Sequence, residues 1–139
     1  MSSANIDAAI FSLLANDATL ASLAPGGVFR STSPPNISSP FVIVDLVEHT
    51  DEHEMGSATP ALEDVRYQVK AVDNSKSMLG AQAAADRIQT LLNGATLTIT
   101  GYTSLNCVRD ERIAYIEVDT PGFRFAHAGG IYHVMVDPT

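Results

Sequence analysis

Residues 62–93 read LEDVRYQVKAVDNSKSMLGAQAAADRIQTLLN. They decide the fold, because the spacing of their apolar residues changes from every second residue, as in a strand, to that of a helix. Over 62–72 apolar and polar side chains alternate, which predicts a strand with one face in the core. Over 75–93 the apolar residues form one stripe at helical spacing, and Gly94 stands where a left-handed carboxyl-terminal cap belongs. The segment therefore predicts a strand followed by an alanine-rich helix that packs closely on a sheet.

The flanking sequence predicts further elements on both sides of this unit. Upstream, apolar spacing indicates a helix over Asn5 to Leu14, and Asn16 or Asp17 can cap a further short helical turn. Phe41 to Val47 is dominated by β-branched residues, so we expect a strand that is buried on both faces and central in the sheet. Further strand-like runs are Val28–Arg30, Thr96–Thr100, Ser104–Val108, Ile113–Val118 and Ile131–Val136.

The order of these elements indicates an α+β fold. Strands are grouped around one long helix, which predicts a mixed or antiparallel sheet packed against two main helices. We expect a single domain over 1–139. The connections are expected at Ser31–Pro40, at His49–Pro60 as a mobile loop, at Arg109–Arg112 and at Pro121–Gly130. The pair Gly129 and Gly130 suggests a tight turn or bulge that enters the last strand.

Composition restricts the class of protein. Apolar residues make up 45% of the 139 residues and charged ones 17%, which is typical of a folded domain. Eight basic against 16 acidic residues give a net charge of −8, which argues against wrapping nucleic acid or sitting on anionic lipid. A single cysteine and the lack of a signal pattern favour a reducing cytoplasm, and no apolar run is long enough for a bilayer.

Acidic residues gather between Asp45 and Asp64, where seven of the 16 lie without a lysine or arginine. One interpretation is a solvated loop that favours solubility, and the other is an electrostatic surface with a task. Beside this segment, the polar positions of the alternating strand offer charges of the opposite sign. The candidate interaction residues are Glu48, Asp51, Glu52, Glu54, Arg66, Gln68 and Lys70.

His49, Glu52 and His53 spell H-x-x-E-H, the inverted zinc-peptidase pattern. That chemistry needs both histidines one turn apart on a rigid helix, with a third ligand downstream. Here the pattern follows a β-branched strand and has no apolar helical face. We therefore expect surface histidines, with adventitious metal binding as the alternative, and we expect that changing His49 and His53 to Ala leaves stability nearly unchanged.

The remaining chemical groups are interpreted as structural. Alternation places His133 on the strand face of Ile131 and Met135, and we expect His127 and His133 to be hydrogen-bonded structural histidines. Cys107 lies among apolar residues and is expected in the core. Phosphate-loop, dinucleotide and nucleophile-elbow motifs are absent from the sequence. We expect no catalytic residue, no cofactor and no metal.

The elements, taken in order, resemble a known family. The opening helix leads through Asn16, Asp17, Leu20, Leu23 and Gly26 to Val28 and Phe29, and a proline-rich stretch then ends in Pro40, Phe41, Val42 and Val44. An alternating strand over 66–69 and a helix over 81–92 precede a closing strand that carries His127, Gly129, Gly130, Tyr132, Val134 and Val136. Over most of the chain this order resembles the tail-completion or tail-terminator proteins of long-tailed bacteriophages.

The resemblance implies a structural protein without catalysis. Such a protein assembles as a hexameric ring on the head-proximal end of the tail tube, ends tube polymerisation and offers a docking surface to the head-completion or connector protein. Its partners would be further copies of itself, the tube protein and that connector, with genomic DNA passing through the lumen unbound and with no membrane. It would lie in the tail-neck region of the virion and assemble in the bacterial cytoplasm.

Two other functions remain open. Another neck, connector or tail tube protein of the same particle is the runner-up, and a small metal-dependent hydrolase that uses His49, Glu52 and His53 is a distant third. For the segment Glu48 to Asp64 we expect a loop that is disordered in the free subunit and faces either the ring lumen or the tube end, because its acids repel one another.

Overall fold

The computed structural model describes residues 3–31, 40–74, 77–118 and 124–138, which form three helices and one six-stranded sheet. The strand order is β1-β2-β3-β6-β5-β4, parallel between β1 and β2 and antiparallel elsewhere. The predicted α+β class with a mixed sheet is therefore confirmed. The elements are α1 (Ser3–Ala15), α2 (Ala18–Leu23), β1 (Val28–Arg30), β2 (Phe41–His53), β3 (Pro60–Asp73), α3 (Leu79–Leu92), β4 (Thr98–Ile99), β5 (Tyr102–Val118) and β6 (Arg124–Pro138).

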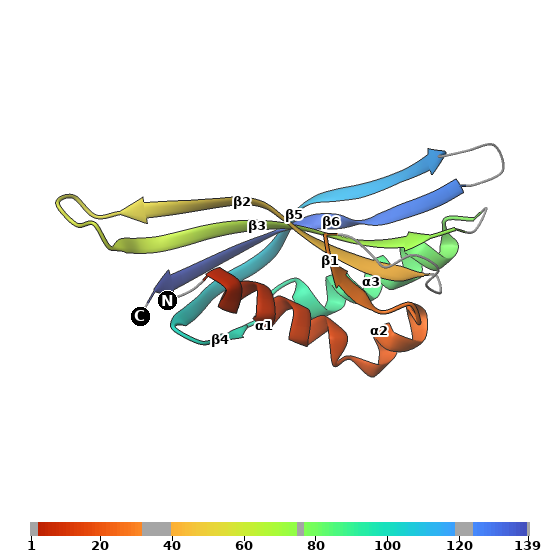
Figure 1. Cartoon of the computed structure of the whole chain (residues 1–139), viewed down its shortest axis with the longest axis horizontal. Helices are drawn as coiled ribbons and strands as arrows, with labels where there is room; N and C mark the ends of the chain where they lie inside the picture. Colours follow the sequence, from red (N-terminus) through yellow and green to blue (C-terminus); the bar gives the residue numbers. More distant parts are fainter. Residues whose placement is uncertain (1–2, 32–39, 75–76, 119–123, 139) are drawn as a thin grey trace.

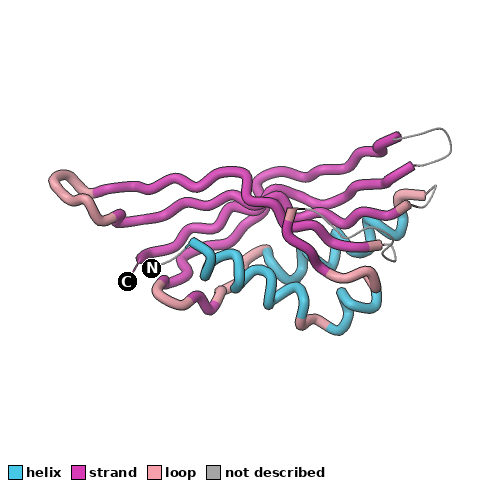
Figure 2. Tube along the Cα trace, viewed as in Figure 1, coloured by secondary structure: helices cyan, strands magenta, loops and turns pink. Residues whose placement is uncertain are grey.

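All three helices lie on one side of the sheet, so the molecule has two layers (Figure 1, Figure 2). The core between the layers has the side chains that periodicity predicts, because every second residue of β3 and one stripe of α3 are buried. The opposite side of the sheet, here called the open face, is covered by none of the three described helices (Figure 1). Core residues from the helices and central strands are Ile6, Ile10, Leu14, Val65, Tyr67, Val69, Ala71, Ala81, Ala84, Ile88, Leu92, Tyr132 and Val134.

The start of α2 confirms one of the two predicted caps. Asp17 is the N-cap residue, and its carboxylate accepts a hydrogen bond of 2.8 Å from the backbone N–H of Leu20. Arg87 on α3 donates two further bonds to the same carboxylate, of 2.7 and 2.9 Å. These bonds, with that of Arg87 first, lower the pKa of Asp17 to about 2. The cap therefore also joins α2 to α3.

Two hairpins extend beyond the helices in opposite directions (Figure 1). One is formed by the outer ends of β2 and β3, and we call residues 48–62 the β2–β3 arm. The other is formed by the outer ends of β5 and β6, where Val118 pairs with Arg124. The sheet is twisted between the two arms, so the β2–β3 hairpin and the β5–β6 hairpin run in different directions in the view of Figure 2, as expected from the right-handed twist of sheets.

The prediction of a mobile loop over His49–Pro60 is wrong, as is the wider prediction of a disordered loop over Glu48–Asp64. β2 continues to His53 and β3 begins at Pro60, so only residues 54–59 form the turn. Alternation failed as a signal because polar residues occupy both faces of the arm. The prediction that Phe41–Val47 is buried on both faces and central holds only at its start. Leu46 and Val47 are each 51% exposed, because β1 pairs only with Val42 to Val44.

The predicted breaks downstream are also wrong. Arg109–Arg112 lies inside one continuous β5, where register shifts occur between Ser104 and Asn106 and between Arg109 and Glu111. Gly129 and Gly130 lie inside β6, so they form no turn, and the bulges are on the neighbouring strand. The described part of the predicted Pro121–Gly130 connection is strand, and most of the predicted Ser31–Pro40 connection lies outside the described residues.

The glycine that ends α3 behaves as predicted. Gly94 has φ +78°, in the left-handed region that favours glycine, and follows the C-cap residue Asn93. Residues 75–76 of the predicted helix lie outside the described part, and α3 begins at Leu79. None of the described helices combines the length and the hydropathy needed to cross a bilayer.

Candidate interaction surfaces

The predicted residues Arg66, Gln68 and Lys70 lie together on the open face. They alternate along β3 with core residues of the helix side, and all three are half-buried. In the register of the sheet, Gln68 stands between Asp45 of β2 and Ile131 of β6. The structure therefore places these three polar side chains in the middle of a sheet face, and not at its rim.

Arg66 lies in a shallow polar hollow of about 640 Å³ on this face. Its guanidinium is 3.7 Å from Glu48 Oε2 and 3.5 Å from Asp110 Oδ2. The lining contains four carboxylates and one guanidinium, a balance of −3 when His133 is neutral. The residues that line this polar hollow are Glu48, Thr50, Asp64, Arg66, Asp110, Glu111 and His133.

His133 lies between two carboxylates of the polar hollow. Its Nε2 contacts Asp64 Oδ1, and its Nδ1 is 3.6 Å from Asp110 Oδ2. The register confirms the predicted strand face, since the neighbours of Ile131, His133 and Met135 across the sheet are open-face residues of β3. Asp64 and Asp110 were not predicted as partners, because they come from different strands and only the register brings them together.

Lys70 belongs to a second, more apolar part of the open face. Its ammonium donates a hydrogen bond of 3.0 Å to Tyr115 Oη, and the Tyr115 ring stacks on His127 with centroids 4.4 Å apart. Burial and the charge of Lys70 lower the pKa of His127. Neither ring nitrogen of His127 makes a hydrogen bond within the described residues, so the prediction of a hydrogen-bonded histidine is wrong at this position. Glu117 Oε1 is 3.8 Å from Nε2.

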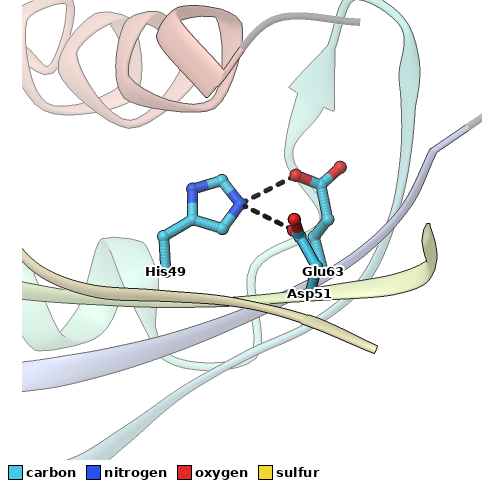
Figure 3. Close-up of side chains that lie close together, drawn as sticks. All are labelled: His49, Asp51 and Glu63. Atoms are coloured by element: carbon cyan, nitrogen blue, oxygen red, sulfur yellow. Dashed lines mark hydrogen bonds and ion pairs between the residues drawn. The ribbon is translucent and has the colours of Figure 1, made fainter. Parts of the chain in front are cut away.

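The predicted acidic residues lie along the β2–β3 arm, on different faces of it. Glu48 borders the polar hollow, and Glu52 and Glu54 are exposed nearer the tip. Asp51 points to the other side of the strand, where it lies beside His49 and Glu63 (Figure 3). The four acids therefore do not form one charged surface.

His49, Asp51 and Glu63 form a compact cluster across β2 and β3 (Figure 3). His49 Nε2 is 2.7 Å from Glu63 Oε1 and 3.7 Å from Asp51 Oδ1. The H-x-x-E-H pattern does not have the geometry of a zinc peptidase, because its residues lie on a strand and Glu52 is no part of the cluster. Glu63 was not predicted as a member of this cluster. It joins the cluster because the hairpin register pairs it with Asp51.

Cys107 has the predicted role. The thiol is fully buried in the core, and burial raises its pKa to about 11. A thiol that is neutral at physiological pH and closed to solvent is a packing group and no nucleophile.

Comparison with known proteins places the chain in a family. The family model of tail completion protein gp17 matches residues 8–138. The chain belongs to this family. The protein is therefore a structural component of a bacteriophage tail, as the order of its elements predicted. No curated protein matches the chain.

Solved structures support the fold. A chain from the virion of a native gene transfer agent particle superposes with a TM-score of 0.73 at 20% identity, covering 98% of this chain and 99% of that one. A second solved structure gives a TM-score of 0.64 at 12% identity, covering 100% and 96%. At these identities the likeness shows a shared fold over the whole domain.

Proposed function

We propose that this protein is the tail terminator, a hexameric ring that caps the head-proximal end of the tail tube. There it ends tube polymerisation and presents a surface to the head-completion or connector protein. The observation that carries the proposal is membership of the tail completion family, together with a sheet that has two long open edges. The protein would act in the neck of the virion and assemble in the host cytoplasm, without enzymatic activity.

The two open edges suit repeated contact between copies. Within the residues that the structure describes, β1 pairs with only three of the 13 residues of β2, and β4 pairs with only two of the 17 residues of β5. The β5 edge is also bonded at Cys107 and Arg109, which contact Gly94 and Asn93, so its open part is the outer end. Open strand edges readily pair with another chain. A contact between the β2 edge of one copy and the β5 edge of the next is heterologous, and such contacts form a ring when the rotation between copies closes.

Exposed apolar side chains follow the same two strands. Among the described residues, six of the eight large apolar side chains that are exposed belong to β2 or β5. β2 and β5 are separated by β3 and β6, so these side chains lie towards both edges of the sheet, where we expect contact with another copy. The six are Leu46, Val47, Leu105, Tyr115, Ile116 and Val118.

Charge supports a lumen through which DNA passes without binding. The β2–β3 arm has no lysine or arginine, and Glu52 and Glu54 are exposed near its tip. Six arms around a ring would create a ring of negative potential that repels phosphates. In the alternative arrangement the arms contact a basic surface of the tube end, and this contact would weaken as salt increases.

The proposal is tested by binding to isolated tail tubes. We expect six copies per tube end, by quantitative mass spectrometry of sedimented tubes, whether the free protein is monomeric or hexameric. Ile116→Lys and Val47→Lys should abolish this binding, because each places a charge on an open-edge strand. The matched control is Leu79→Lys on α3, which changes a side chain that is 73% exposed and lies outside both edges.

Two results would contradict the proposal. Wild-type protein that stays folded and monomeric and does not sediment with tubes would exclude a cap. Equal loss of binding in Leu79→Lys and the two edge variants would exclude the open edges as the contact surface. Binding to heads in place of tubes would favour the runner-up, a neck or connector protein.

A further inference from the structure

We propose that His49, Asp51 and Glu63 bind one divalent transition-metal cation at the base of the β2–β3 arm. The three donor atoms are one imidazole nitrogen and two carboxylate oxygens, and all lie within 4.8 Å of one another (Figure 3). This departs from the expectation that the chain binds no metal. It does not depend on the ring proposed above.

The donor atoms are already at nearly the spacing that a cation needs. Bonds of about 2.0–2.2 Å to zinc place neighbouring ligand atoms about 2.8–3.6 Å apart in octahedral or tetrahedral geometry. In the structure His49 Nε2 is 2.7 Å from Glu63 Oε1 and 3.7 Å from Asp51 Oδ1. These two distances lie within about 0.1 Å of that range, and the oxygens of Asp51 and Glu63 lie within 4.8 Å of each other, so rotation of the two carboxylate side chains would complete the site.

The backbone supports this spacing. Asp51 pairs with Glu63 across the antiparallel strands, and His49 precedes Asp51 by two residues on the same face. Paired and diagonal side chains of neighbouring strands lie within reach of one another. The strands therefore hold the three donors together without a loop that must first become ordered.

Charge at the cluster favours a cation. Two carboxylates stand beside one imidazole, and the ion pairs found in the described part of the chain join neither Asp51 nor Glu63 to a lysine or arginine. Glu63 is only 7% exposed, and a buried carboxylate is costly without a positive partner. A divalent cation would neutralise both carboxylates, whereas a proton on His49 would neutralise only one.

Glu63 also has the supporting contact that metal ligands usually have. Burial first, and then the neighbouring Glu63 carboxylate, raise the pKa of Tyr102 at the start of β5 to about 12, so the Tyr102 hydroxyl lies close to that carboxylate. Such contacts orient a ligand and tune its affinity for metal. Tyr102 is itself 8% exposed, so this neighbour of Glu63 belongs to the buried body of the domain.

The donor set indicates the class of cation. One imidazole with two carboxylates suits zinc, manganese, iron or cobalt, whereas magnesium and calcium prefer oxygen ligands alone. Three protein ligands leave coordination positions for water. A bound cation would join β2 to β3 where the arm leaves the body and would fix the direction of the arm.

The test measures binding of Zn²⁺ and Co²⁺ to the purified full chain after removal of metal with a chelator. We expect one cation per chain by calorimetry, the absorption of a low-symmetry Co²⁺ site, and a rise in Tm of about 5 °C or more at a hundredfold excess over Kd. Mg²⁺ and Ca²⁺ should give no comparable rise.

The variants separate this cluster from the H-x-x-E-H pattern. His49→Ala and Glu63→Gln should weaken binding at least 10-fold, and Tyr102→Phe should weaken it about 10- to 100-fold, as the loss of an outer contact does. His53→Ala and Glu52→Gln are the matched controls, because both residues belong to the pattern and to the same arm but not to the cluster. Neither should change affinity. The apo Tm of each variant shows whether it folds.

Three outcomes would overturn the proposal. The first is wild-type protein without stoichiometric binding of Zn²⁺ or Co²⁺, which would leave a His49–Glu63 ion pair only. The second is equal loss of affinity in His53→Ala and His49→Ala, which would indicate adventitious binding by the histidines of the arm. The third is unchanged affinity in a folded Glu63→Gln variant.

Discussion

Gly129→Ala should destabilise the sheet where β6 pairs with β3. A Cβ at position 129 would lie 2.1 Å from the carbonyl oxygen of Val69 and 2.5 Å from Cα of Lys70. Real Cβ contacts are essentially never shorter than 3.0 Å, so the backbone of β3 or β6 must move by about 0.9 Å. Both contacts are with backbone atoms, which cannot rotate away as a flexible side chain can.

The expected cost is that of overpacking a closely packed interior, about 1–3 kcal/mol. Unfolding entropy is about 2.1 cal/mol/K per residue, which for 139 residues is about 0.29 kcal/mol/K. The two values predict a fall in Tm of about 3–10 °C. Differential scanning calorimetry measures this fall, and circular dichroism shows whether the strand content is retained.

Gly56→Ala is the matched control, because nothing lies within 4 Å of the Cβ position of Gly56 while its φ is +83°. It reports the cost of the left-handed conformation alone, about 1 kcal/mol. A Tm for Gly129→Ala within 2 °C of wild type, or a larger fall for Gly56→Ala, would refute the reasoning from close approach.

Three further perturbations test the packing and the charges. Tyr132→Phe removes a hydrogen bond of 2.9 Å to Gln89 that joins β6 to α3, and it should cost about 1–2 kcal/mol in urea denaturation. His127 has a lowered pKa, caused first by burial and then by Lys70, so the unfolded chain takes up the proton first as pH falls. Its contribution to stability is present above about pH 6.5 and is lost below it, and wild type should therefore lose more Tm between pH 7.5 and 5 than His127→Gln. Arg66→Gln leaves the carboxylates of the polar hollow without their cation; stability should fall by about 1 kcal/mol and should recover in high salt, as thermal melts at two ionic strengths would show.

The body of the fold could be predicted from its periodicities. The alternation along β3 and the stripe of α3 each match buried faces in the structure, because one side of each element lies in the core. The Asp17 cap and the Gly94 cap were predictable for a different reason. Each depends on one residue only: the Asp17 carboxylate accepts a backbone N–H at the start of a helix, and Gly94 adopts the left-handed conformation that follows the end of one.

The arms could not be predicted in this way. Along 48–53 neither face of β2 is in the core, so no apolar period reveals the strand, and turn residues such as Gly56 and Pro60 favoured a loop. Gly129 was wrongly predicted to form a turn. Glycine occurs in tight turns and also where two strands approach closely, so the residue type alone does not distinguish the two. The polar hollow and the His49–Asp51–Glu63 cluster were missed because both depend on the register between strands.

The role at the end of the tail is tested most directly by the length of tails made without this protein. Electron microscopy of particles from a strain that lacks the gene, complemented by wild type or by Ile116→Lys, measures that length. A terminator predicts overlong tubes without heads in the deletion and in Ile116→Lys, with normal length restored by wild type and by Leu79→Lys. Tubes of normal length in the deletion, with heads absent, would contradict termination and place the protein elsewhere in the neck.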